Sequence, residues 1–214
     1  TLAGKANLGD LSGITDSTIS GGTLVLSGDA DLTKETLPVI KSGIEIGDKA
    51  TVTVGSAFAP EGAITGDGTL AVAGGTAAAP VDLSKATSIG VEVQVNNGAF
   101  LAGDLADFAA KGITGQEGAT AENAGTVVIN AASDAGTTAV SGVKVEIASE
   151  GNLKVAQDTF MADGSFNPLA LSGDGKLTIT GSVLNLSDGT LANDFFGNLT
   201  VIDTDGITLG KANS

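Results

Sequence analysis

The chain has 214 residues, enough to bury a sizeable core, yet it contains no Cys, His, Arg, Trp or Tyr. Its formal net charge of −15 opposes binding to nucleic acid or to an anionic membrane surface, because both partners need Lys and Arg to neutralise phosphates. No apolar run reaches the roughly 18 residues that a transmembrane helix requires. The absence of Cys is typical of exported bacterial and viral surface proteins, in which a free thiol is a liability.

Aromatic residues make up only 3% of the chain, so Val, Ile, Leu and Ala must form the core. A compact sandwich usually needs large aromatic side chains to fill the space between its sheets. A thin core inside stacked coils can be filled with small aliphatic side chains. The composition therefore favours a solenoid over a sandwich.

The N-terminal third mixes short strands with one expected helical turn. Residues 1–18 predict an irregular arm or a first coil, and residues 23–26 alternate as a strand does. We expect a helical turn over 29–40, with Asp31 as its N-cap and Pro38 ending it.

Two further strands, at 43–46 and 51–54, flank the residues 47–50, a connection of the length used in a hairpin or a corner. Residues 56–64 predict a loop, and a strand is expected at 69–73.

The middle of the chain holds the best helix candidate. Residues 74–80 are rich in Gly and Ala and favour a linker, whereas 91–95 alternate cleanly as a strand. A helix is predicted over 101–111, with Asp104 as its cap, and residues 112–125 predict an exposed loop.

The C-terminal part predicts more short strands, with Phe in the turns between them. Two of these strands flank the residues 148–151, again a connection of hairpin length. The expected turns with Phe are 158–166 and 191–196, and the expected strands are 126–129, 143–147, 152–155, 176–180, 183–186, 198–202 and 207–209.

A unit made of a Gly turn, a short strand and a Gly occurs three times, at 21–28, 66–74 and 173–181. These units resemble the repeats of bacterial autotransporter passengers and related secreted β-solenoid surface proteins. The resemblance implies a non-catalytic adhesin or surface-fibre role. The interval from the second unit to the third is much longer than that from the first to the second, whereas a strict solenoid keeps one period.

These patterns predict an all-β fold with one or two short helices, built as an irregular β-solenoid or a β-sandwich of about a dozen short strands. We expect a single elongated β domain over residues 1–214. The alternative is an N-terminal β domain at 1–111 and a C-terminal one at 126–214, joined by a linker at 112–125.

The sequence favours a protein that is not an enzyme. Acid–base and nucleophilic sites commonly use His, which is absent. Ser141 and Lys144 match the S-x-x-K spacing, but that motif works on a helix, and a strand is expected here. Carbohydrate-active sites usually contain Trp or Tyr platforms, which are also absent.

Structural calcium is the one cofactor that the sequence suggests. Asp203 and Asp205 could begin an oxygen-ligand loop, and Asp29 with Asp31 pairs two carboxylates. An EF-hand loop counted from Asp203 would need Glu at its twelfth position, where Ser214 stands. The interpretation that the sequence favours is turn chemistry, because Asp beside Gly bonds its own backbone.

By elimination, we expect a structural or adhesive surface protein of the fibre, S-layer or adhesin type, located outside the cell. It would form a homo-oligomer or assemble with other surface or coat subunits, without nucleic acid and without membrane insertion. The alternative is a virion component such as a capsid decoration, a spike or a tail protein. The chain begins at Thr1 without Met, so we expect it to be processed or trimmed.

Overall fold

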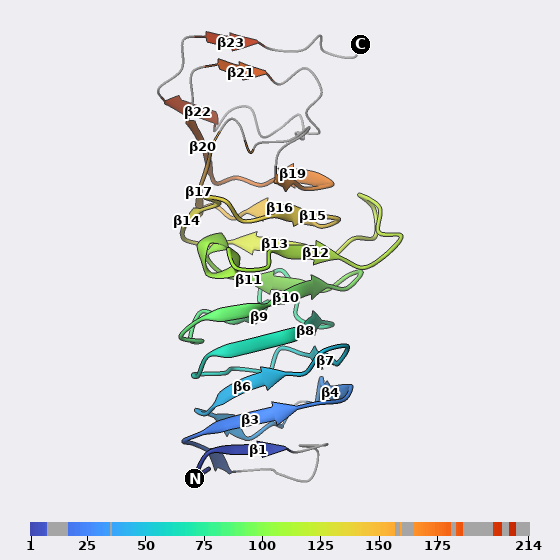
Figure 1. Ribbon diagram of the computed structural model, residues 1–214. Coiled ribbons are helices and arrows are strands. Elements are labelled where there is room, and N and C mark those ends of the chain that lie inside the picture. The colour runs from blue at the N-terminus through green and yellow to red at the C-terminus, as the bar shows by residue number, and fades with distance from the viewer. Residues whose placement is uncertain are drawn as a thin grey trace.

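The protein is a β-solenoid of about eight turns. The computed structural model describes residues 1–7, 17–34, 36–156, 159 and 165–180, together with the backbone alone of 183–185, 199–202 and 206–208. Figure 1 shows the coils stacked from the N-terminus at the bottom to the C-terminal strands at the top. Of the two architectures that the sequence left open, the solenoid is confirmed.

All the strand pairs of the described chain are parallel, and they form five sheets. The ten-stranded sheet contains β1 (Lys5–Asn7), β3 (Thr23–Leu26), β4 (Ala30–Leu32), β6 (Gly43–Ile46), β7 (Thr51–Val54), β8 (Ile64–Val72), β10 (Ile89–Val95), β12 (Ile113–Gly115), β15 (Val140–Ser141) and β18 (Phe166–Asn167). The five-stranded sheet contains β9 (Val81–Asp82), β11 (Phe100–Ala102), β13 (Thr126–Ile129), β16 (Lys144–Ile147) and β19 (Ala170–Ser172).

The remaining sheets are smaller. The four-stranded sheet contains β14 (Ala132–Asp134), β17 (Asn152–Ala156), β20 (Lys176–Thr180) and β22 (Leu199–Ile202). The two-stranded sheets are β2 (Thr18–Ile19) with β5 (Val39–Ile40), and β21 (Val183–Asn185) with β23 (Gly206–Thr208).

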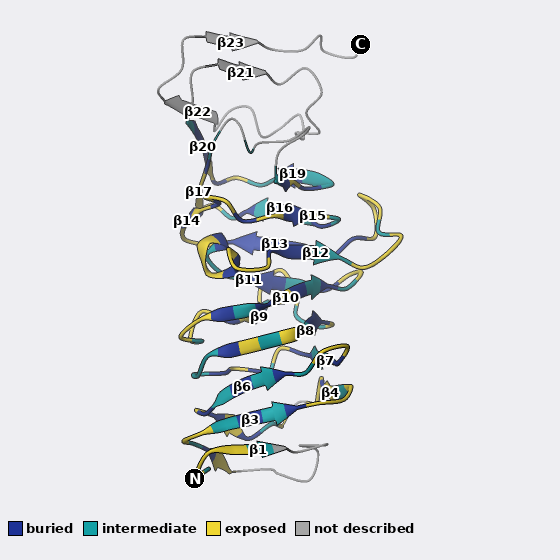
Figure 2. Ribbon diagram, in the orientation of Figure 1, coloured by how far each residue is buried: buried dark blue, intermediate teal, exposed yellow. Residues whose placement is uncertain are grey.

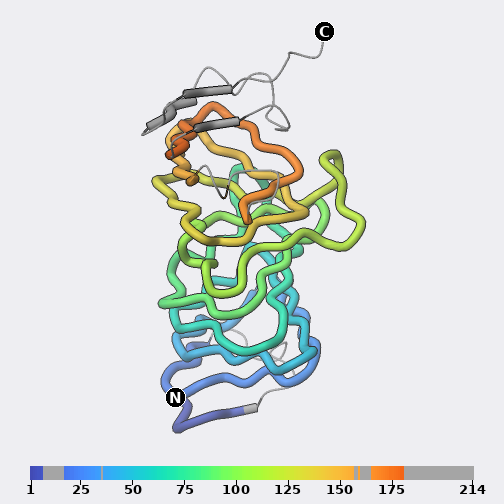
Figure 3. The backbone as a smooth tube through the Cα atoms, turned by 45° about the horizontal axis from the view of Figure 1, so that its top comes forward, coloured from blue at the N-terminus to red at the C-terminus, as the bar shows by residue number. Residues whose placement is uncertain are grey.

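Each strand pairs with a strand of the next coil, so the register gives the length of each coil. The interval from Lys5 to its partner Thr23 is among the shortest, and that from Ile113 to its partner Val140 is the longest. The coil length therefore varies along the stack. Figure 3 shows the larger excursions as loops outside the tube of coils.

The core consists of columns in which each coil adds one aliphatic side chain above the last. The longest column is in register along the ten-stranded sheet. It begins at the partly buried Ala30 and continues through buried side chains: Val52, Leu70, Val93, Ile113, Val140 and Phe166. Burying one such side chain contributes about 1.5–3 kcal/mol. Figure 2 shows the buried residues along the strands and the exposed ones mainly at the corners.

Phe plays a larger part in the core than its position in the sequence suggested. Phe58 lies in a connection and Phe108 in a short 3-10 helix, yet both are buried within the core cluster. Phe166 lies in a strand and ends the aliphatic column. The few aromatic side chains thus extend the core. The expected turn at 191–196 lies outside the described residues, as does most of the one at 158–166.

The Gly-Asp-Gly turns of the second and third sequence units make the same corner. A Cβ on Gly66 would lie 2.0 Å from the carbonyl oxygen of Ile46, and one on Gly173 would lie 2.1 Å from that of Ile147. Both glycines also have a positive φ, +123° and +121°. At this corner one backbone therefore rests directly on the coil beneath it, which only Gly permits.

The first sequence unit occupies a different corner. Its strand is β3, which pairs through β6 with the first half of β8, whereas the strand of the second unit is the second half of β8. A different signal follows the coils: Gly-Asp pairs recur at a constant spacing, at 9–10, 28–29, 47–48 and 66–67. The last three pairs lie between β3 and β4, between β6 and β7, and inside β8.

The prediction of a helical turn over 29–40 is wrong. The segment instead contains the strands β4 and β5, and β4 pairs with β7 of the next coil. Asp31 is not an N-cap, because its carboxylate accepts hydrogen bonds from the backbone and the hydroxyl of Thr33 in a local turn. Strand pairing with the next coil outweighs the weak local helix preference.

The connections at 47–50 and 148–151 are corners, which is one of the two alternatives expected for 47–50. The strands on either side of each connection do not pair with each other, and each pairs in parallel with other coils. The residues of a short connection do not reveal whether it is a hairpin or a solenoid corner. The same turn-forming residues reverse the chain in a hairpin and redirect it at a corner.

The helix expected over 101–111 shrinks to the four-residue 3-10 helix η1 (Leu105–Phe108). Its Asp104 cap is confirmed, since the carboxylate accepts a hydrogen bond from the N–H of Ala106. Residues 100–102 belong to β11 instead. η1 contacts both β10 of the ten-stranded sheet and β14, the first strand of the four-stranded sheet.

The loop expected over 112–125 begins with a strand. β12 occupies 113–115 and pairs with β10 on one side and β15 on the other. The single domain over 1–214 and its two-domain alternative both stay predictions.

Replacing Gly66 by Ala tests the corner. We expect a loss of at least about 2 kcal/mol of unfolding free energy, because the methyl group would collide with the Ile46 carbonyl and the backbone φ is strained. The matched control is Gly28→Ala, where a Cβ meets nothing within 4 Å and which should stay within about 0.5 kcal/mol of the parent. Equal losses in urea denaturation would contradict this account of the corner.

Candidate functional site

A concave site lies beside η1, where the helix interrupts the regular stacking of strands. Its volume is about 280 Å³. We call it the η1 recess, and its polar lining comes from Asp82, Ser84, Asp104, Asp107, Asn130 and Ser133.

Asp104 is the centre of the hydrogen-bond network at this recess. Its Oδ1 accepts from the N–H of Ala106 (3.1 Å), the hydroxyl of Ser133 (3.0 Å) and the N–H of Asp134 (3.2 Å). The Ser133 oxygen in turn accepts from the N–H of Leu105 (2.9 Å). The network joins η1 to β14 of the next coil, and so fixes the shape of the recess.

Two of the carboxylates in the recess differ in their environment. Partial burial raises the pKa of Asp107, and the neighbouring Asp104 carboxylate raises it further. Asp82 accepts a hydrogen bond from the N–H of Ser84 at 2.9 Å, an ordinary turn interaction.

The recess can accept hydrogen bonds from hydroxyl or ammonium donors, since acceptors dominate its polar lining. In the ranges that the structure describes, no three Asp or Glu side chains gather in a group that could hold a metal ion.

Of the four residues suggested as calcium ligands, the structure describes Asp29 and Asp31, and their carboxylates accept hydrogen bonds from different partners. Asp29 accepts from the N–H of Thr51 in the next coil (2.8 Å), whereas Asp31 accepts from the N–H (3.0 Å) and hydroxyl (2.7 Å) of Thr33. The Thr33 hydrogen bonds lower the pKa of Asp31. Asp203 and Asp205 lie outside the described residues. Calcium stays a prediction, while turn chemistry accounts for Asp31 and a hydrogen bond to the next coil accounts for Asp29.

Ser141 and Lys144 do not lie one helical turn apart. Ser141 belongs to β15 in the ten-stranded sheet, and Lys144 begins β16 in the five-stranded sheet. The S-x-x-K spacing here crosses a corner between two sheets.

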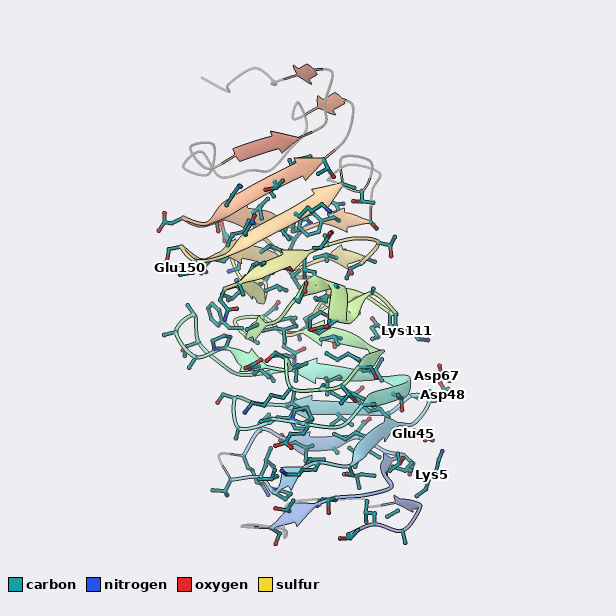
Figure 4. All side chains as sticks on the ribbon, turned by 90° about the vertical axis from the view of Figure 1, so that its left-hand side faces the viewer. Lys5, Glu45, Asp48, Asp67, Lys111 and Glu150 are labelled. Carbon is teal, nitrogen blue, oxygen red and sulfur yellow. The ribbon has the colours of Figure 1, made fainter. Side chains whose placement is uncertain are left out.

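Ion pairs connect coils along the outside of the stack. Lys5 pairs with Glu45, and Lys111 pairs with Asp67 at 3.4 Å, as Figure 4 shows along one side of the molecule. Each of these pairs spans more than one coil. Their side chains are accessible to solvent, so each pair contributes less than about 1 kcal/mol.

The core contains one buried hydroxyl without a partner among the described residues. Ser42 is 1% exposed, and its Oγ makes no hydrogen bond. Thr138 is equally buried, but its hydroxyl donates to the carbonyl oxygen of Leu105 at 2.8 Å, beside the η1 recess.

Sequence reasoning found Asp104 as a cap but missed Ser133 and Asp107 as its neighbours. Asp104 and Ser133 are far apart in the sequence, and only the coil register joins them. The regular recurrence of Gly-Asp would have indicated coil stacking, although it stops before η1.

No family model, no curated protein and no solved structure matches this chain. Among the described residues, no helix has both the length and the apolar character needed to span a bilayer.

The stability contributions of Asp107 and Asp31, two of the carboxyls with shifted pKa values, should respond to pH with opposite signs. Because the pKa of Asp107 is raised on folding, its charge costs stability at neutral pH, and Asp107→Asn should stabilise the protein there. The gain in stability should shrink as the pH falls through the raised pKa of the folded state. It should vanish below the ordinary pKa of an Asp, where the wild-type carboxyl is protonated in both the folded and the unfolded state.

The control for this prediction is Asp31→Asn. The pKa of Asp31 is lowered on folding, so its contribution is present at neutral pH and is lost as the pH falls through the folded-state pKa. Asp31→Asn should therefore destabilise at neutral pH and approach the parent in acid. Denaturation curves over a pH series measure both variants, and shifts of the same sign would contradict the assignment.

The two buried hydroxyls provide a second matched pair. Ser42→Ala should leave the free energy of unfolding unchanged or raise it, because the lost hydroxyl has no partner. Thr138→Val should cost about 0.5–1.5 kcal/mol, because it removes the buried hydrogen bond to the Leu105 carbonyl. Chemical denaturation measures both, and a larger loss for Ser42→Ala would show that its hydroxyl is bonded.

Proposed function

We propose that this protein is a non-enzymatic structural or adhesive surface protein that assembles with itself or with neighbouring subunits outside the cell. The observation that carries the proposal is the stack of parallel coils, in which each coil is hydrogen bonded to the next along the axis. Such a stack is a stiff, elongated element, suited to bearing load or holding a surface at a distance.

The N-terminal end of the stack supports assembly. β1 pairs with β3 on one side and has no strand partner on its other edge within the described residues. An open strand edge is a template for strand addition. A head-to-tail contact through such an edge produces a fibre when its rotation does not close into a ring.

Charge sets the conditions under which assembly should occur. A net charge of −15 makes neighbouring copies repel each other at low ionic strength. Salt or divalent cations would reduce this repulsion, so we expect assembly to increase with either.

Sedimentation of the purified chain at micromolar concentration tests the proposal. We expect oligomers that grow with salt or calcium and shrink in chelator at low salt, because screening weakens the repulsion. Sodium chloride at the ionic strength of the calcium sample is the control that separates screening from calcium binding. A monodisperse monomer in all these conditions would overturn self-assembly.

A further inference from the structure

The corner between β10 and β11 contains the one Asn-Gly step of the whole sequence, Asn97–Gly98. The turn is closed by a hydrogen bond from the N–H of Ala99 to the carbonyl of Asn96 (3.0 Å). Asn97 and Gly98 are both exposed, and Gly98 has φ +73° with nothing within 4 Å of the position of a Cβ. The turn is therefore accessible to solvent and sterically open.

Residues 116–125 form a loop that projects from the stack between β12 and β13 (Figures 1 and 3). The side chain of Asn123 closes it by accepting from the N–H (2.8 Å) and the hydroxyl (3.1 Å) of Thr120. This projecting loop, which we call the 116–125 loop, is thus shaped by its own hydrogen bonds.

The 116–125 loop is seated on the Asn-Gly turn by two hydrogen bonds. The N–H of Asn97 donates to Oε1 of Gln116 at 3.2 Å, and the N–H of Gly98 donates to the carbonyl oxygen of Asn123 at 3.0 Å. The two acceptors come from the two ends of the loop. Both backbone N–H groups of the turn are therefore occupied while the loop is seated.

We propose that Asn97 is a site of spontaneous succinimide formation, and that the 116–125 loop controls its rate. In this reaction the Gly98 nitrogen loses its proton and attacks Cγ of Asn97. A Cγ–N bond forms, the Cγ–amide bond breaks, and the amide nitrogen leaves as ammonia with the proton. Water then opens the ring at either carbonyl and produces Asp or isoaspartate, so no oxidant, reductant or further reactant is needed.

The 116–125 loop controls the reaction rate because it binds the Gly98 nitrogen, which must attack. Gly98 N can attack only after it has released the Asn123 carbonyl and the Asn97 backbone has turned toward the reactive geometry. That rotation also breaks the bond from Asn97 N–H to Gln116. The reaction therefore proceeds from the fraction of molecules in which the loop has lifted from the turn.

The reaction permanently changes the turn to which the 116–125 loop is hydrogen bonded. Asp adds a negative charge to the turn and leaves the backbone unchanged. Isoaspartate lengthens the backbone by one carbon between Cα of residue 97 and the Gly98 nitrogen, one residue before Ala99, which is 3% exposed. Isoaspartate therefore disturbs the geometry that presents two N–H groups to the loop. The corner thus records the time spent with the loop open as an irreversible change of the turn.

Peptide mapping by mass spectrometry of the folded chain, incubated at mildly alkaline pH, tests the proposal. We expect slow conversion of Asn97 to Asp and isoaspartate. Gln116→Ala removes one anchor of the loop and should speed the conversion by about two- to tenfold, the change in open population that the loss of one hydrogen bond produces. Gln94→Ala, on the neighbouring strand β10, is the matched control and should convert at the parent rate.

Hydrogen exchange of the Asn97 and Gly98 amides provides the second measurement. Both amides should exchange faster in Gln116→Ala than in the parent or in Gln94→Ala. Conversion of Gln116→Ala at the parent rate, despite faster amide exchange, would overturn control by the loop. If neither folded protein converts while the denatured chain does, Asn97 is not a modification site of the native protein.

Discussion

Successive coils lie one strand spacing apart, about 4.8 Å, and at the Gly-Asp-Gly corners the backbone can meet this spacing only because Gly has no side chain. A Cβ on Gly66 or Gly173 would lie 2.0 or 2.1 Å from a carbonyl oxygen of the coil beneath, far inside van der Waals contact. With these corners in place, the strands pair in parallel and the aliphatic side chains lie in columns.

The stack of coils departs from a regular repeat where the coils are longer. The intervals from Phe100 to its partner Thr126 and from Ile113 to its partner Val140 are longer than those of the N-terminal coils, such as Lys5 to Thr23. The additional chain provides η1 with its recess and the 116–125 loop. The features that differ from coil to coil are therefore concentrated in the middle of the stack, while the shorter coils supply the scaffold.

The polar groups of the middle coils are bound to one another across coils. Asp104 joins η1 to β14 through Ser133, and the Asn97–Gly98 turn holds both ends of the 116–125 loop. The part of the Asp104 network at Ser133 is buried, and a buried network specifies one arrangement when it is fully satisfied. The exposed ion pairs contribute far less, because solvent screens them.

The sequence by itself determined the short strands, the aliphatic core and the cap at Asp104, because alternation and capping are properties of a few neighbouring residues. It also carried the regular recurrence of Gly-Asp, which signals stacking in the first coils. The tertiary structure alone decided that the turns at 47–50 and 148–151 are corners, that 29–40 forms strands, and that Asp29 and Asp31 bond to different partners. The physical reason is that strand partners lie a whole coil away along the chain, and the coils differ in length. The local pattern therefore specifies which face of a strand is buried but not which strand lies beside it.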